Sequence, residues 1–317
     1  MPHFSADQFL DALRHLAQVP PRNELRSMSL ALRKARKEER EAIAAPFVAA
    51  HRAAARQACK SPRVTKLLDD PWIEAALKSA MRGASTLPTD EAEAKANKRF
   101  LSGLGHSFDV PPMLGSGPLS PGDLIDALDQ ITPGIFRWTV LILSALQEYH
   151  LEPDAARRWA SVYKEVDELD RRIQIGAEAL KDLTGLAQSL HPPSHNHVAR
   201  KDTSDEASAA AERKILTAAK KPLRHIRDSL PPPLRLDGTA SVRLLIYRLC
   251  IANRYVFRAT KPAAIELFLQ AAGLRPLDSR NVNRAINANS PYPPAKGAVE
   301  YRRILIANRD ISAWAEK

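Results

Sequence analysis

The sequence feature that most constrains the fold is an apolar repeat that begins at Trp159 and ends at Leu190. Its members recur at alternating spacings of three and four residues, which is the a/d pattern of a coiled-coil helix over about four heptads. Carboxylates that precede arginines by four positions, as in Glu168 and Arg172, favour the same helix. The repeat predicts one long helix with a single seam: Trp159, Val162, Val166, Leu169, Ile173, Gly176, Leu180, Leu183, Ala187 and Leu190.

The heptad pattern does not specify what packs against the seam. One interpretation is antiparallel packing on another helix of the same chain, for which the helical runs 23–59 and 205–229 are the candidates. The other is self-association or a foreign protein partner.

The rest of the chain is also expected to be helical. Glycine, which is costly in helices, occurs only 12 times in 317 residues, while alanine and leucine occur throughout. The 24 prolines gather between helical runs and separate them. We therefore predict an all-α, multi-helical fold.

Proline-rich and polar stretches divide this fold into three predicted domains. A loop-like stretch over 105–120 suggests an N-terminal helical domain, 1–118. A helical and coiled-coil middle region, 119–232, follows, with a linker near 192–203. Three consecutive prolines at 231–233 then introduce a basic C-terminal module, 233–317.

The formal net charge of +11 favours polyanionic partners, because cationic side chains release counterions from phosphates. Residues 241–317 hold thirteen Lys and Arg against five Asp and Glu, so most of the excess lies in the last quarter of the chain. Within this quarter we expect a helix from about 241 to 257, a second from Pro262 to a C-cap at Gly273, and a third starting near Ser279.

This arrangement, KPAAIELFLQAAG followed by LRP and LDSRNVNRAI, resembles a winged helix-turn-helix domain. The resemblance covers about a quarter of the chain and implies duplex DNA binding, with the third helix toward the major groove. Arg and Asn have the bidentate geometry for guanine and adenine edges. The expected DNA-binding residues are Arg275, Arg280, Asn281, Asn283, Arg284, Asn287, Lys296, Arg302 and Arg303.

Two structures remain open for Val299 to Ile306, namely a wing strand or a last helix, and the β-branched and aromatic residues there favour the strand. Two functions also remain open. The first is a DNA-binding regulator or a subunit of a DNA-associated complex of a mobile element, a phage or a defence system. The second is a helical adaptor that binds proteins through the seam 159–190.

No catalytic motif is found, and the chain is expected to be non-enzymatic and to need no cofactor. The three histidines His191, His195 and His197 lack a cysteine or carboxylate at ligand spacing, so no metal site is predicted. Cys59 and Cys250 are expected to be buried, reduced thiols. With no signal-like start and no apolar run of about 20 residues, the chain is expected to be cytoplasmic and soluble.

Overall fold

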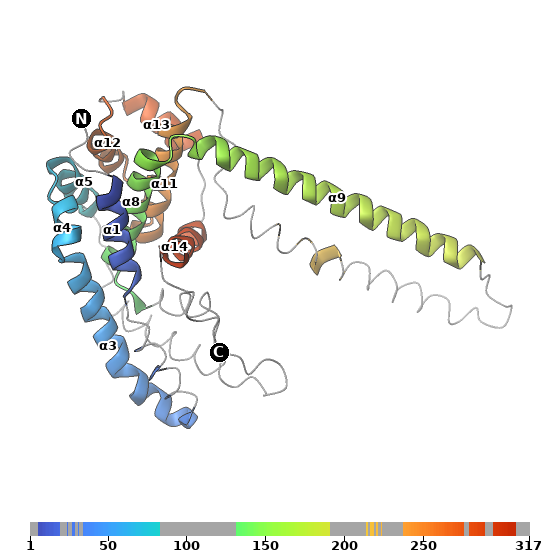
Figure 1. The fold of residues 1–317 in the computed structure, drawn as a ribbon, viewed down its shortest axis with the longest axis horizontal. Helices are drawn as coiled ribbons and strands as arrows, with labels where there is room; N and C mark the ends of the chain where they lie inside the picture. The colour runs from blue at the N-terminus through green and yellow to red at the C-terminus, as the bar shows by residue number, and fades with distance from the viewer. Residues whose placement is uncertain are drawn as a thin grey trace. The chain divides into compact units, whose positions relative to one another are not determined.

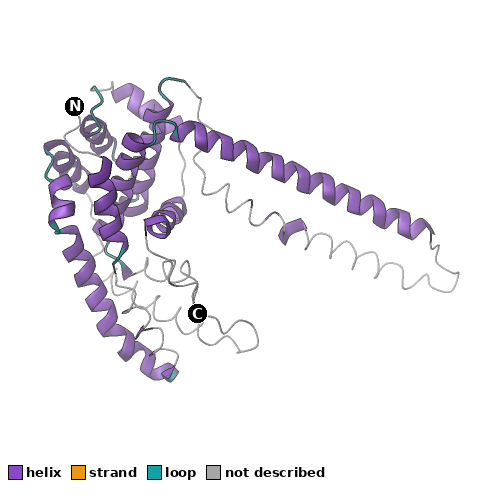
Figure 2. Ribbon diagram, in the orientation of Figure 1, coloured by secondary structure: helices purple, strands orange, loops and turns teal. Residues whose placement is uncertain are grey.

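A computed structural model describes residues 6–19, 34–82, 131–190, 237–275, 279–288 and 294–308, together with residues 24, 27, 28, 31, 214, 216–218, 220 and 223. Every regular element in these residues is helical, which confirms the predicted all-α class (Figures 1 and 2). The predicted loop over 105–120 and the linker near 192–203 lie outside the described residues.

The chain divides into two compact units, and the second interrupts the sequence of the first. One unit joins Met1–Ala155 to Asp237–Lys317, and the other is Ala156–Leu236. This grouping differs from the predicted division at 118 and 232, because the N-terminal and C-terminal helices share one hydrophobic core. The elements of the first unit are α1 (Ala6–Ala17), η1 (Lys37–Glu39), α3 (Arg40–Cys59), α4 (Pro62–Leu68), α5 (Pro71–Met81), α8 (Gly134–Leu151), α11 (Ala240–Phe257), α12 (Pro262–Ala271), α13 (Ser279–Ala288) and α14 (Pro294–Asn308).

Helix α8 is central to the first unit because apolar residues cover most of its sides. Trp138, Val140 and Leu143 are all buried, although they point in different directions around the helix. Helices α1, α11 and α14 pack against α8 (Figure 1), while α5 packs against α12.

The strand interpretation of Val299 to Ile306 is wrong, because these residues lie within α14. The buried positions of α14 are Gly297, Glu300, Tyr301, Ile304 and Leu305, whose spacings of three and one define a single helical face. Gly297 allows this face to approach α11, since a Cβ there would come within 2.6 Å of Tyr255 Cγ. Helical periodicity therefore outweighs the β propensity of the individual residues.

The second unit contains α9 (Ala155–Leu190), a single helix of 36 residues that spans the whole predicted seam. Val166 is buried after Ala156, and most of the half-buried described positions share its heptad spacing: Trp159, Tyr163, Asp170, Ile173 and Ala177. Ala160, Val162 and Glu168 are also half-buried. Lys220 Nζ lies 3.6 Å from Asp170 Oδ1, so Lys220 lies beside this stripe. The contact agrees with an internal partner in 205–229, while the coiled-coil interpretation itself stays a prediction.

The half-buried His150 of α8 faces α1. The His150 ring stacks on Phe9 at 5.8 Å between centroids, and burial lowers the pKa of His150 below 6.5. The unfolded chain therefore binds this proton more tightly than the folded protein does. We expect the free energy of unfolding to decrease as pH falls from about 6.5 to the lowered pKa of the folded state.

The comparison of wild type with His150→Phe measures this contribution, because phenylalanine keeps the stacking and cannot titrate. Urea unfolding at pH 7 and pH 5 should show a smaller loss of stability on acidification in the variant. An identical loss in both proteins would contradict the assignment to His150.

Candidate nucleic-acid interface

A tight turn connects α12 to the start of the segment that leads into α13. Gly273 adopts a left-handed conformation with φ of 80°. Its N–H donates to Gln270 O at 2.9 Å, and Leu274 N–H donates to Leu269 O at 3.0 Å. These two bonds are those of a Schellman motif, so Gly273 is the left-handed C-cap that the sequence predicts.

Helix α13 separates apolar and polar residues sharply. Val282 and Ile286 are buried, at 0% and 5% exposure, and belong to the core that α11 and α12 also form. Five polar side chains are exposed: Arg280, Asn281, Asn283, Arg284 and Asn287.

Four of these five residues lie on one face of α13. Arg280, Asn283, Arg284 and Asn287 have the i, i+3, i+4, i+7 spacing that lines up side chains along a helix, and Asn281 lies beside them. The face opposite the core thus presents two guanidinium groups and two carboxamides together. We call Arg280, Asn283, Arg284 and Asn287 the polar face of α13.

The other predicted DNA-binding residues belong to other parts of the chain. Arg275 is exposed in the turn after α12. Lys296, Arg302 and Arg303 are half-buried in α14, which packs against α1, α8 and α11. Arg303 also pairs with the buried Glu300, at 2.7 Å from Nη2 to Oε1, so its guanidinium is engaged within the fold.

A buried charge cluster joins three helices of the first unit. Arg248 of α11 lies 2.9 Å from Glu148 of α8 and 2.9 Å from Glu300 of α14, and each residue is at most 9% exposed. Burial alone would raise the pKa of Glu300, but the charges of Arg248 and Arg303 hold it below its usual range. Burial also opposes the Arg248 charge, yet Glu300 and Glu148 raise the pKa of this arginine. Arg248 and Glu300 are therefore both charged, and together with Glu148 they tie α8, α11 and α14 to one another.

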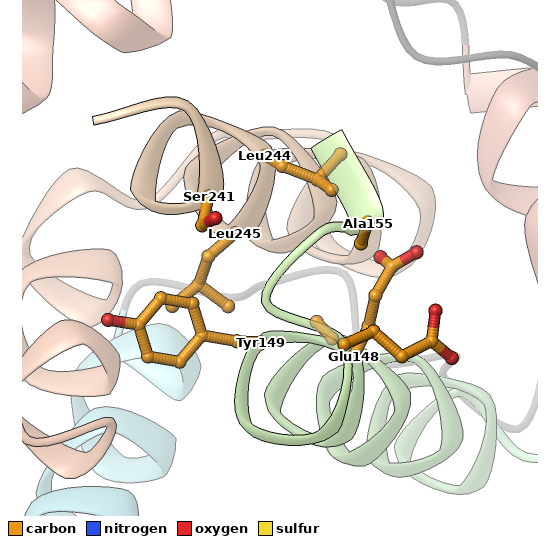
Figure 3. Close-up of a pocket in the computed structure, with 8 residues that line it drawn as sticks. Glu148, Tyr149, Ala155, Ser241, Leu244 and Leu245 are labelled. Carbon is orange, nitrogen blue, oxygen red and sulfur yellow. The ribbon is translucent and has the colours of Figure 1, made fainter. Parts of the chain in front are cut away.

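A small hollow lies where the end of α8 meets the start of α11 (Figure 3). Its volume of about 10 Å³ is room for roughly one water molecule, far below the several hundred Å³ of sites for organic ligands. The hollow is lined by Ala145, Glu148, Tyr149, Glu152, Ala155, Ser241, Leu244 and Leu245.

The two cysteines have the chemistry of structural thiols. Burial raises the pKa of Cys59 to about 11, although a hydrogen bond with Thr139 lowers it in part. Burial also raises the pKa of Cys250 to about 12. Both thiols therefore stay protonated and unreactive at neutral pH. Within the described part of the chain, His, Cys, Asp and Glu form no group of three or more that could hold a metal ion. The three histidines at 191, 195 and 197 lie outside it.

No family model, no curated protein and no solved structure matches the chain. Among the helices of the described residues, none is long and apolar enough to cross a membrane.

Proposed function

We propose that the protein binds duplex DNA through the polar face of α13. The observation that supports this proposal is the separation within α13, where apolar residues fix one side of the helix in the core and Arg and Asn occupy the other. A helix held in this way presents its polar side chains on a rigid support. Such a support is what base reading in the major groove requires.

The side-chain chemistry favours nucleic acid over an acidic protein partner. Guanidinium groups form bidentate bonds with guanine and neutralise phosphate, and carboxamides form bidentate bonds with adenine. Arg280 and Arg284 alternate with Asn283 and Asn287 along one face, so both kinds of donor reach the same groove. A surface for an acidic protein would need the charges but not the carboxamides.

Part of the C-terminal positive charge is not available for this role. Arg248 is buried between Glu148 and Glu300, and Arg303 pairs with Glu300. The proposal therefore rests on α13 and the exposed Arg275, and it gives Lys296, Arg302 and Arg303 of α14 at most a supporting role.

Fluorescence anisotropy of a labelled duplex, titrated with the protein across a salt series, tests the proposal. We expect affinity to fall steeply with salt, and Arg280→Ala together with Arg284→Ala to weaken binding at least tenfold. If both arginines contact phosphate, the slope of log affinity against log salt should decrease by about two.

A matched control removes two positive charges elsewhere. Arg56 and Lys60 are exposed on or next to α3 with the same four-residue separation. Arg56→Ala with Lys60→Ala should leave affinity nearly unchanged. Equal losses in both double variants would show a diffuse charge effect and contradict reading by α13, as would absence of binding at low salt.

A further inference from the structure

Next to the stripe of α9 that Lys220 contacts, one edge of the helix is mostly uncovered by the residues that the structure describes, although Val162 at its start is half-buried. Val162, Leu169 and Gly176 lie seven residues apart on this edge, so they follow one line along the helix. Leu169 is 46% exposed. Gly176 is exposed, and a Cβ placed there would meet nothing within 4 Å. The chain's described residues therefore do not use the close approach that this glycine permits.

Two opposite charges flank Leu169 on the same edge. Glu165 precedes Leu169 by four residues and Arg172 follows it by three, and both are exposed. Together with Val162, Leu169 and Gly176 they form what we call the open edge of α9. Its order along the helix is apolar, acidic, apolar, basic and small.

We propose that the open edge of α9 binds the open edge of a second copy of this chain, antiparallel, with a two-fold axis beside Leu169. The two Leu169 side chains then meet at the axis. Glu165 of each copy faces Arg172 of the other, and Val162 of each copy lies opposite Gly176. A two-fold interface requires this kind of self-complementary surface, in which each contact occurs twice.

The charges select the antiparallel orientation. A parallel pair in register would place Glu165 against Glu165 and Arg172 against Arg172, which is unfavourable twice over. A foreign partner would have no reason to match the symmetric order of residues about Leu169, whereas a second copy matches it by construction.

The existing bonds of these charges leave them available. Glu165 accepts from Ser161 Oγ at 3.4 Å, and Arg172 Nε lies 3.0 Å from Glu168 Oε1, both on the exposed helix surface. Exposed bonds of this kind contribute little and can be shared or exchanged. The paired helices would overlap over roughly 40 Å, which is a small interface, so we expect dissociation constants in the micromolar range.

Sedimentation velocity of the full chain, treated with nuclease and measured from about 1 to 200 μM, tests the proposal. Wild type should shift from monomer to dimer over this range. Leu169→Glu should raise the dissociation constant at least tenfold, because it places two carboxylates at the axis.

Ile175→Glu is the matched control. Ile175 is 57% exposed on the same helix and lies about 120° around it from Leu169. This variant should dimerise like wild type. Equal loss in both variants would indicate damage to α9 and overturn the proposal, as would a wild-type monomer at every concentration.

A charge swap tests the orientation. Glu165→Arg alone should weaken the dimer, because it places two arginines together. Adding Arg172→Glu restores opposite charges across an antiparallel interface and should recover dimerisation, with helix content checked by circular dichroism. A double variant no better than the single one would overturn the antiparallel arrangement. None of these outcomes depends on DNA binding by α13.

Discussion

Arg248→Met is expected to lower the free energy of unfolding by about 3–5 kcal/mol, because it removes the buried cation that Glu148 and Glu300 share and leaves Glu300 with Arg303. Glu148 and Glu300 are 9% and 4% exposed, and both lie within 3 Å of the Arg248 guanidinium. Methionine fills much of the volume of the arginine side chain. The decrease in the free energy of unfolding therefore measures the loss of the charge and not the creation of a large cavity. Urea unfolding followed by circular dichroism measures it.

Arg303→Met is the control for this substitution. Arg303 also pairs with Glu300, but its side chain is 39% exposed and Glu300 keeps Arg248 when Arg303 is removed. Its loss should be no more than about 1 kcal/mol. Similar losses for the two variants would contradict a cluster centred on Arg248.

The pH dependence of the Arg248 variant provides a second readout. Without Arg248, burial should raise the folded-state pKa of Glu148 above its unfolded value, whereas Glu300 still faces Arg303. Protonation of Glu148 then favours the folded state. The difference in the free energy of unfolding between the variant and wild type should therefore shrink as pH falls through the raised pKa. A deficit that stays constant with pH would indicate lost packing in place of unpaired charge.

Trp138→Ala should cost about 3–5 kcal/mol of stability, because it removes the largest fully buried side chain among the described residues. Trp138 makes edge contacts with Phe257 and Phe268, and its Nε1–H donates to Asn253 Oδ1 at 2.9 Å. Asn253 in turn donates to Thr260 O at 2.8 Å. The substitution thus loosens α8 from both α11 and α12.

Two further variants separate the contributions of the hydrogen bond and of burial to the stability loss of Trp138→Ala. Trp138→Phe keeps most of the aromatic contact and leaves the Asn253 carbonyl without its donor, which should cost about 1–3 kcal/mol. Trp72→Ala removes a tryptophan that is 46% exposed at the start of α5 and should cost well under 1 kcal/mol. Thermal and urea unfolding measure these losses. Equal stability losses for Trp138→Ala and Trp72→Ala would contradict a central role of Trp138 in the core.

Local signals were sufficient for the helices and for the faces of α13. Pro71 and Pro262 mark helix starts, Gly273 marks an end, and the spacing of Val282, Ala285 and Ile286 indicates the buried side. These features depend on neighbours within one or two turns, so the sequence carries them directly. The prediction of a strand over Val299 to Ile306 was wrong because it relied on the β propensity of single residues, whereas the helical spacing of the apolar residues decides the structure.

Long-range pairing was beyond the reach of the same reasoning. Arg248 lies 100 residues from Glu148 in the sequence. Each is a charged residue within a helix, and such a residue is ordinarily expected on the solvated surface. Only the fold shows that α8, α11 and α14 bring them together. The shared core of the N-terminal and C-terminal regions was missed for the same reason, because local proline clusters resemble domain boundaries.

The interrupted first unit has a consequence for synthesis of the protein. Nearly ninety residues separate the end of α8 at Leu151 from the start of α11 at Ala240. At translation rates of about 5–20 residues per second, α11 is synthesised roughly 5–20 s after α8. The apolar side of α8 that packs on α11 stays uncovered by it during that time. During that interval the nascent chain exposes Trp138 and its neighbours near the ribosome, where they would be natural targets for chaperones. Folding of the N-terminal helices is thereby tied to completion of residues far downstream.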